Sequence, residues 1–230
     1  MNNPDIASHE VWATKIFTMQ WPEYEENAPA LIRHLYDLQS AENQNIASGL
    51  ALSAKPKSGL FESRFNLFAT QNPELLALTN YIGDALRSVA SYVNGGTRPP
   101  AMIDVVATES WFHITNNGGF HDAHYHGNCS WCGIFYAQAG DAETPQNQSA
   151  GNGTNRFYSP IGTGACYMDY GNAYLRKDYF DVQPVDGQLV LFPSFLLHSA
   201  LPYTGDQDRI VISFNSQIFE AGPNASPSRS

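Results

Sequence analysis

The feature that most constrains the fold of this 230-residue chain is a change in residue pattern near Met102. Beyond that point, short runs of apolar, β-branched and aromatic residues alternate with turn-forming residues, a pattern typical of a β-sandwich or β-barrel. The runs that look most like strands are VVATESWFHIT, SWCGIFYAQA, GACYMDY, GQLVLFPS and RIVISFNSQIF. The sequence therefore predicts a mainly β core from about residue 101 to residue 220.

The first third of the chain has a helical pattern instead. Residues 24–43 place leucines at helical spacing. A second helix is predicted to begin with Asn72 as its N-cap and Pro73 at its first position, and to end before the glycine pair at residues 95–96. Between the two helices we expect a short strand around Phe65–Phe68.

These elements predict one α+β domain over residues 1–220, with a largely helical support over about residues 1–100 packed on the outside of the β core. Residues 141–155 are rich in Gly, Asn, Gln and Ser, which predicts a mobile loop that can act as a lid. Residues 221–230 are expected to form a flexible tail.

Charge and composition exclude several classes of protein. The formal net charge is -10, from 12 Lys and Arg against 22 Asp and Glu, and no basic run offers a surface for nucleic acid or an anionic membrane. No apolar run approaches the length of a bilayer span, and the first residues do not have the pattern of a signal peptide. Three cysteines are too few for a disulfide framework. We expect a soluble cytoplasmic protein, and the sequence leaves its oligomeric state open, a homodimer included.

Three of the seven histidines lie in one stretch, GFHDAHYHGNCSWC, at residues 119–132. Side chains two positions apart on a strand share a face, so Asp122, His124 and His126 are expected to point the same way. A pair of imidazoles alone is more typical of a polar surface loop than of a metal site. His198, just after a very apolar run, supplies the remote third ligand that a barrel needs for a metal site.

The CxxC of the same stretch, Cys129 to Cys132, is a weak zinc signal because no second pair accompanies it. On a strand, Cys132 would share a face with Ile134 and Tyr136. We therefore expect Cys132 to be a small packing residue rather than a ligand.

Arg209 begins the last predicted strand, eleven residues after His198. Half-exposed edge strands also show its alternation of apolar and polar residues. If a hairpin turn pairs the strands of His198 and Arg209, however, the guanidinium lies near any metal on His198. Its planar fork suits a bidentate grip on a carboxylate. This arrangement predicts an acidic co-substrate that chelates the metal at one end and is held by Arg209 at the other.

In four segments the chain resembles the iron(II)- and 2-oxoglutarate-dependent oxygenases, and more narrowly a bacterial and phage group of them. The segments are GLFESRFNLF, HYHGNCSWCGIFYAQ, DGQLVLFPSFLLHSALPY and RIVISFN. The resemblance covers most of residues 48–215, and its second half is the more specific. It implies a double-stranded β-helix (jelly-roll) barrel with helices on one side, and Fe(II), 2-oxoglutarate and O₂ as cofactors.

The resemblance also implies roles for individual residues. His124 and His198 would be metal ligands, and Arg209 would hold the far carboxylate of 2-oxoglutarate with Tyr136, Ser213 and Asn215 near it. The wider superfamily has Asp or Glu two residues after the first histidine, whereas this chain has His126 there. The third ligand is therefore His126, as in the narrower group, or Asp122. Candidate substrate contacts at the mouth are Trp111, His113, His121 and Tyr125.

The activity implied is hydroxylation of an unactivated C–H bond in a small molecule, an amino acid or a peptide side chain, with release of succinate and CO₂. Two other functions use the same residues. A three-histidine cupin-type metalloenzyme would work without 2-oxoglutarate, and a non-catalytic jelly roll would only bind a ligand or a partner.

Overall fold

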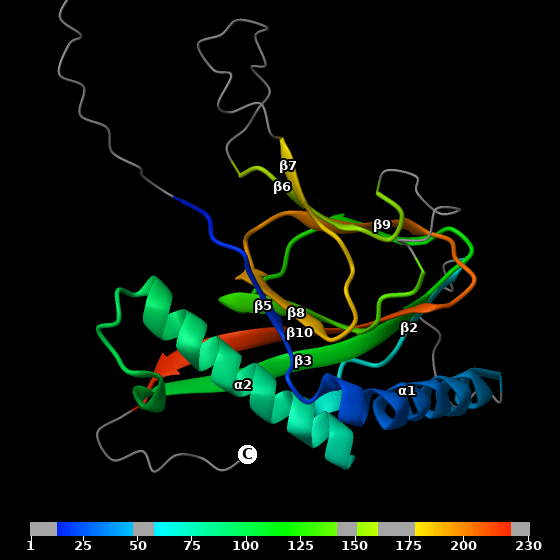
Figure 1. Ribbon diagram of the computed structural model, residues 1–230, viewed down its shortest axis with the longest axis horizontal. Helices are drawn as coiled ribbons and strands as arrows, with labels where there is room; N and C mark the ends of the chain where they lie inside the picture. Colours follow the sequence, from blue (N-terminus) through cyan, green and yellow to red (C-terminus); the bar gives the residue numbers. More distant parts are fainter. Residues whose placement is uncertain (1–12, 48–57, 142–150, 161–177, 222–230) are drawn as a thin grey trace, which may run out of the picture.

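The computed structural model describes residues 13–47, 58–141, 151–160 and 178–221, and Figure 1 shows how they are arranged. The helices are α1 (Tyr24–Ala47) and α2 (Pro73–Val93), with short 3-10 turns at Leu67–Ala69 and Pro100–Met102. The strands are β1 (Phe17–Gln20), β2 (Leu60–Glu62), β3 (Ile103–Thr115), β4 (Gly119–His124), β5 (Trp131–Gln138), β6 (Asn155–Tyr158), β7 (Tyr179–Val182), β8 (Gln188–Pro193), β9 (His198–Tyr203) and β10 (Arg209–Glu220).

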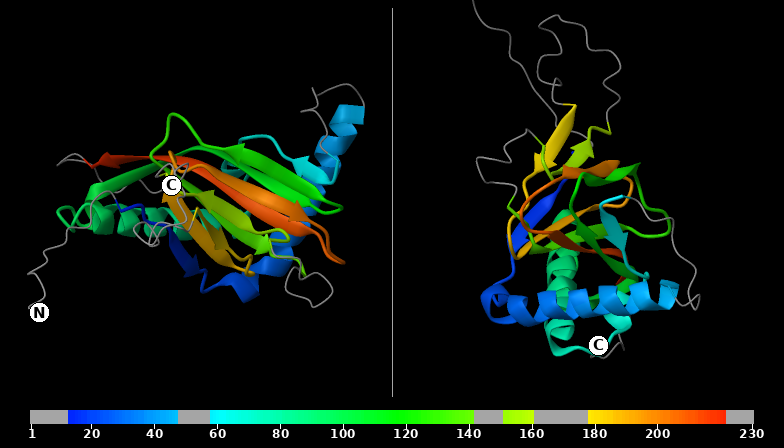
Figure 2. Two further views of the ribbon diagram at one scale, coloured as in Figure 1. Left: turned by 90° about the horizontal axis from the view of Figure 1, so that it is seen from above. Right: turned by 90° about the vertical axis from the view of Figure 1, so that its right-hand side faces the viewer.

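The strands form two antiparallel sheets that face each other. The larger sheet has the order β1-β8-β5-β10-β3-β2, and the smaller has the order β4-β9-β6-β7. Both helices cover the outer face of the larger sheet, so the molecule has three layers (Figures 1 and 2). This is the predicted α+β fold, a double-stranded β-helix with its helices packed outside.

Residues of β10 alternate between two hydrophobic clusters, one on each face of the larger sheet. Ile210, Ile212 and Phe214 pack in the cluster that includes both helices. Val211 belongs to the cluster between the sheets. β10 is therefore a central strand buried on both faces and not a half-exposed edge strand.

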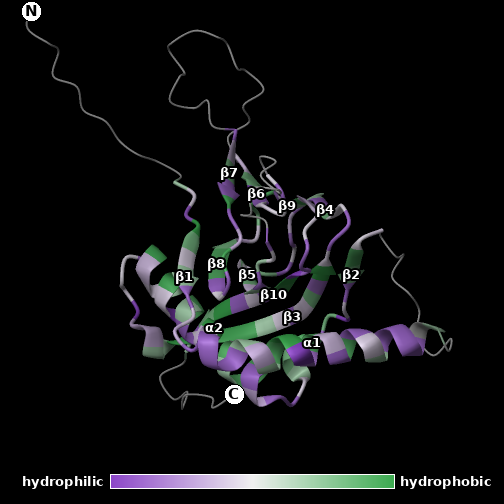
Figure 3. Ribbon diagram, turned by 45° about the vertical axis from the view of Figure 1, so that its right-hand side comes forward, coloured by the Kyte–Doolittle hydropathy of each residue, from purple (hydrophilic) through white to green (hydrophobic). Residues whose placement is uncertain are grey.

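The two helices form where their patterns predict. The Asn72 side chain accepts a hydrogen bond from the backbone N–H of Leu75 at 2.9 Å, which caps α2, and Pro73 is the first residue of that helix. Figure 3 shows hydrophobic and hydrophilic residues alternating around α1, as expected of a helix with one buried face. None of the described helices is long and apolar enough to cross a membrane.

Four predictions about local structure need correction or lie outside the described residues. The strand expected at Phe65–Phe68 is wrong: β2 lies at Leu60–Glu62, and a 3-10 turn follows at Leu67–Ala69, where the Ser110 hydroxyl accepts a hydrogen bond from the N–H of Phe68. Of the loop predicted at residues 141–155, residues 142–150 lie outside the described residues, and its last residue, Asn155, begins β6 instead. The GACYMDY strand and the tail from residue 222 lie outside the described residues.

The expected hairpin between the strands of His198 and Arg209 is also wrong. β9 belongs to the smaller sheet and β10 to the larger, so the two strands do not pair. The connection crosses from one sheet to the other. The two residues therefore approach the space between the sheets from opposite walls, and both line the same pocket there.

Candidate metal and co-substrate site

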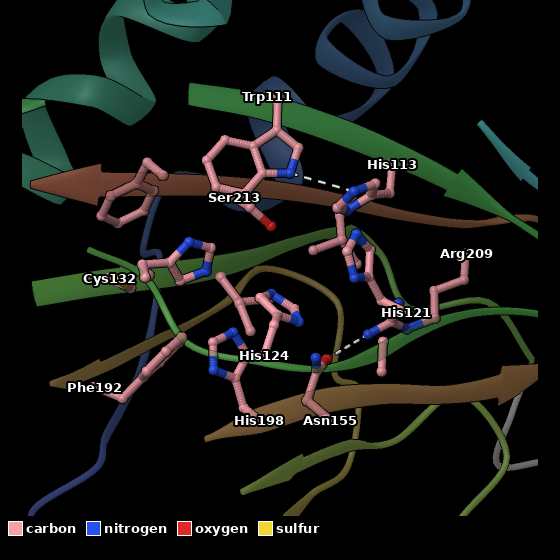
Figure 4. Close-up of a pocket in the computed structure, with 16 residues that line it drawn as sticks. Trp111, His113, His121, His124, Cys132, Asn155, Phe192, His198, Arg209 and Ser213 are labelled. Carbon is pink, nitrogen blue, oxygen red and sulfur yellow. Dashed lines mark hydrogen bonds between the residues drawn. The ribbon is translucent and has the colours of Figure 1, made fainter. Parts of the chain in front are cut away.

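A pocket lies between the two sheets. Figure 4 shows its polar side chains pointing toward one another from strands of both sheets. The residues that line it are Trp111, His113, His121, His124, His126, Cys132, Gly133, Ile134, Asn155, Phe192, His198, Ala200, Arg209, Val211, Ser213 and Phe214.

Three imidazoles converge on one wall of this pocket. His124 on β4 and His198 on β9 are directly opposite each other in the antiparallel register, and their ring centroids lie 4.4 Å apart. His126 follows β4, and its backbone N–H donates to the carbonyl oxygen of Ser194 at 3.1 Å. One ring nitrogen from each histidine lies within 4.8 Å of the other two, so the three can hold one metal ion.

Two of these rings are oriented by backbone carbonyl oxygens. Nδ1 of His198 lies 2.9 Å from the carbonyl oxygen of Leu196, and Nδ1 of His124 lies 2.6 Å from that of Asp122. A carbonyl oxygen can only accept, so each Nδ1 carries the proton and donates. The lone pair on Nε2 is then available to a metal, as in most protein metal sites.

The environment favours the neutral form of the imidazoles. Burial, together with the neighbouring His124, lowers the pKa of His198 to about 3. The same two causes, burial and then His124, lower the pKa of His126 to about 4. Because only neutral imidazole offers a lone pair, these rings are ready to bind a metal at neutral pH without first losing a proton.

In the metal-free protein, the free energy of unfolding is expected to fall as the pH is lowered from about 6.5 to about 4.5. The unfolded chain protonates His198 near the ordinary value of 6.5, while the folded chain keeps it neutral down to about 3. The unfolded state therefore binds more protons in this window, and acid destabilises the fold. Within this window, His198 alone changes the free energy of unfolding by about 1.4 kcal/mol per pH unit.

Urea unfolding in the presence of a chelator, repeated across this pH range, measures the slope. A His198→Gln variant is expected to show a shallower slope. If wild type and variant have equal slopes, His198 is protonated in the folded protein and the predicted neutral imidazole is wrong.

Asp122, the other candidate for the third ligand, is exposed. Its carboxylate is in neither of the two groups of described residues whose geometry suits a metal. Its backbone carbonyl oxygen takes part in the site instead, by orienting His124.

Arg209 lies in the pocket with only 2% of its surface exposed. Among the described residues it has no carboxylate partner, and its buried Nε has no hydrogen-bond partner. One terminal nitrogen donates to the side-chain oxygen of Asn155, and the guanidinium carbon lies 5.2 Å from the centre of the Tyr136 ring. Burial lowers the pKa of Arg209, yet a guanidinium stays protonated in proteins, so the pocket contains a cation that lacks an anion.

Tyr136 and Asn155 hold this arginine in place. The Tyr136 hydroxyl donates to the side-chain oxygen of Asn155 at 2.7 Å, the same oxygen that accepts from Arg209. Sequence reasoning missed Asn155, since it follows a Gly- and Ser-rich run and was assigned to a loop. A buried arginine without an acidic partner needs another hydrogen-bond acceptor, such as a side-chain amide. The sequence does not show that Asn155 is this acceptor, because its position depends on the pairing of β6 with β9.

Ser213 and Asn215 point to the same side of β10 as Arg209 but differ in their surroundings. Ser213 lines the pocket. Asn215 does not line it: its amide donates to Glu109 at 2.7 Å, and its oxygen accepts from the thiol of Cys132 at 3.2 Å. Cys132 is 1% exposed and packs in the cluster between the sheets.

The predicted substrate contacts separate into two sets. Trp111, His113 and His121 line the pocket, whereas Tyr125 is 69% exposed and does not. Simple strand alternation placed His121 and His124 on opposite faces. An irregularity in the β4–β9 register between these residues lets both line the pocket.

A second group of metal-ligand type lies beside the first. Glu62, His113 and His121 also bring one ligand atom each within 4.8 Å of the others. Sequence reasoning missed Glu62, because the strand in its segment was expected several residues later.

Comparison with known proteins shows which family the pocket-forming part of the chain resembles. Residues 109–215 match the model of a protein family described as "Putative 2OG-Fe(II) oxygenase". Over these residues the chain is similar to the 2OG-Fe(II) oxygenase family. The match and the shared fold together indicate a 2-oxoglutarate-dependent oxygenase, and the cofactors of that family are Fe(II), 2-oxoglutarate and O₂. No curated protein matches the chain.

Solved structures share the oxygenase fold at low sequence identity. A prolyl-4-hydroxylase from Pseudomonas putida is 17% identical, with 91% of this chain and 94% of that chain covered and a TM-score of 0.51. HygX from Streptomyces hygroscopicus, solved with nickel, 2-oxoglutarate and hygromycin B, is 12% identical, with coverage of 89% and 83% and a TM-score of 0.55. A prolyl hydroxylase from Trichoplax adhaerens, in complex with a hypoxia inducible factor peptide, is 14% identical, with coverage of 88% and 83% and a TM-score of 0.52.

Proposed function

We propose that this oxygenase holds Fe(II) on His124, His126 and His198, binds 2-oxoglutarate with Arg209, and hydroxylates a C–H bond of a small molecule, an amino acid or a peptide side chain. The observation that supports this most directly is one pocket with two features. Three imidazoles converge on one wall, and a buried guanidinium without an acid lies on another.

The residues of the pocket suit both cofactors. Imidazoles are good ligands for Fe(II), and in His124 and His198 the Nδ1 atom donates to a backbone carbonyl oxygen, which leaves Nε2 as the ligand atom. Three such ligands leave positions open for the co-substrate and oxygen. Arg209 gains a carboxylate partner when the dicarboxylic acid binds, which offsets the cost of its burial. Tyr136 and Asn155 fix the guanidinium so that little side-chain entropy is lost on binding.

The bound cofactors supply the oxidising chemistry, in which O₂ is consumed and 2-oxoglutarate is converted to succinate and CO₂. The chain positions and protects the reacting groups. Phe192 and Ile134 make part of the wall apolar, which limits water near the metal. Trp111, whose indole N–H donates toward His113, contributes an aromatic wall against which a substrate can pack.

The substrate class follows from the pocket and from the relatives. HygX is solved with hygromycin B and the Trichoplax enzyme with a peptide, so the fold accepts both small molecules and peptide segments. The pocket of this chain is lined by both apolar and polar side chains, which suits a substrate that has an apolar part and a few polar groups.

Anaerobic addition of 2-oxoglutarate to the Fe(II)-loaded protein is expected to produce a weak charge-transfer absorption band in the visible. Admission of oxygen should then release succinate, slowly without substrate and faster with it. Samples loaded with Zn²⁺ or lacking 2-oxoglutarate serve as controls.

The outcome separates the three functions. A protein that binds Fe(II) but gives neither the band nor succinate would be a three-histidine enzyme that does not use 2-oxoglutarate. A protein that binds no metal would be a ligand-binding jelly roll. Either result contradicts the proposal.

A further inference from the structure

We infer that Glu62, His113 and His121 form a second metal site that binds a divalent transition-metal ion of the Zn²⁺ class beside the three-histidine centre. This inference does not depend on the proposed oxygenase chemistry. It concerns a different set of ligands, which no step proposed above uses.

The three side chains come from three strands and meet at one point. Glu62 is on β2, His113 on β3 and His121 on β4. Oε2 of Glu62 lies 2.9 Å from Nε2 of His113 and 3.1 Å from Nε2 of His121. The convergence therefore involves one atom of each residue, and all three side chains are largely buried.

These separations fit coordination of an ion as well as they fit hydrogen bonds. Metal–ligand bonds of about 2.1 Å place neighbouring donor atoms about 3.0 Å apart at the right angles of an octahedral site and about 3.4 Å apart at the angles of a tetrahedral Zn²⁺ site. Two imidazoles and one carboxylate are also a donor set that first-row transition metals favour. The strands would need little adjustment to accept an ion.

The charge states of the residues suit a metal. The two histidines lower the pKa of Glu62 well below its ordinary range through their hydrogen bonds, so the carboxylate is ionised. Burial lowers the pKa of His113, which favours its neutral form. One anion and a neutral imidazole offer an incoming cation a net negative charge.

Without a cation, the hydrogen bonds around His113 conflict. The indole N–H of Trp111 points at Nε2 of His113 at 3.2 Å, while the ionised Glu62 lies 2.9 Å from the same nitrogen. If Nε2 accepts from Trp111, two lone pairs face each other across 2.9 Å. If Nε2 donates to Glu62, the N–H of Trp111 points at another N–H. A cation between Nε2 and Oε2 removes the opposition of the two lone pairs, because both atoms then donate electron pairs to it. It uses the single lone pair of Nε2, so the N–H of Trp111 must then donate to another acceptor.

An ion at this position would join the two sheets. β2 and β3 belong to the larger sheet and β4 to the smaller, so the three ligands span the end of the barrel. Their ligand set shares no residue with the three-histidine group, although the rings of His121 and His124 are only 4.7 Å apart. The two ions would repel each other, and the Glu62 carboxylate offsets part of that repulsion.

Co²⁺ binding to the full-length, tag-free protein tests the inference, by equilibrium dialysis in the absence of 2-oxoglutarate. Wild type is expected to bind two ions per chain. Glu62→Gln should bind one, because an amide oxygen is neutral and a poor ligand. His126→Ala should also bind one, and the double variant should bind none. Glu109→Gln is the matched control: it removes a carboxylate from β3 that belongs to neither group, and it should still bind two.

The possible outcomes are distinguishable. One ion in wild type, lost in His126→Ala and retained in Glu62→Gln, overturns the second site and leaves the proposed function intact. One ion that is lost in Glu62→Gln and retained in His126→Ala supports the second site and contradicts the three-histidine centre. If wild type binds no ion, both are wrong.

A folding defect is separated from ligand loss by a second variant. His113→Asn removes a different ligand of the same group and should also reduce the count from two to one, with circular dichroism and the melting temperature confirming that each variant is folded. If His113→Asn folds and still binds two ions, the site does not exist as inferred.

Discussion

Replacement of Arg209 by methionine is expected to raise the apparent KM for 2-oxoglutarate by about 100-fold or more. A buried charged pair that loses one member costs about 3 kcal/mol, and each 1.4 kcal/mol corresponds to about tenfold in affinity. Methionine has a similar length and no charge, so it fills the space without providing a partner for the carboxylate. Steady-state turnover at varied 2-oxoglutarate concentration measures the change.

The same variant is expected to be at least as stable as wild type when 2-oxoglutarate is absent. The guanidinium is 2% exposed and has no acidic partner among the described residues, so its removal relieves a desolvated charge. Added 2-oxoglutarate should raise the melting temperature of wild type and leave that of Arg209→Met unchanged. This opposite response of stability and affinity distinguishes a binding arginine from a structural one.

Arg156 on β6 provides the matched control. It forms a bidentate pair with Asp181, at 2.8 Å and 2.9 Å, and so already has its carboxylate. Arg156→Met should leave the KM for 2-oxoglutarate unchanged. If Arg209→Met keeps the wild-type KM, the co-substrate is held elsewhere and the proposed role of Arg209 is wrong.

The long elements of the fold could be predicted from the sequence because each has its own strong pattern. α2 has an N-cap, a first-turn proline and an apolar stripe, and β10 has a large apolar residue at every second position from Ile210 to Phe214. β2, with three residues, and β6, with four, are too short for any period to be visible. These strands form because neighbouring strands pair with them, and pairing is a tertiary effect that local patterns do not contain.

Because local sequence patterns do not contain strand pairing, only some residues of the site could be predicted from the sequence. The HxH pair, His198 and Arg209 were visible because each lies in or next to an element with a clear pattern. Glu62 and Asn155 were not visible, because each depends on a short strand that was assigned elsewhere or to a loop. The inward position of His121 depends on a register irregularity in β4, and strand alternation alone predicts the opposite face. Sequence therefore identified the histidines and the arginine of the pocket and missed Glu62 and Asn155, which two very short strands supply.

Replacement of His198 by glutamine is expected to reduce turnover by about 1000-fold or more and to abolish tight binding at the three-histidine centre. The remaining pair, His124 and His126, does not enclose the ion from the β9 side, and the metal supplies several kcal/mol of catalysis in sites of this type. Glutamine keeps much of the volume between Phe157 and Phe192, so the loss should not come from a collapsed core. Succinate release and metal content of the purified protein measure the two effects.

Ser199→Ala serves as the neighbouring control for this variant. Ser199 is equally buried at 4%, but its hydroxyl contacts Tyr158 at 3.1 Å and it does not line the pocket. This variant should lose some stability and retain both metal and turnover. A His198→Gln protein that retains wild-type turnover would contradict the three-histidine centre even if Arg209→Met behaves as expected. The two variants therefore test the metal and the co-substrate ends of the pocket independently.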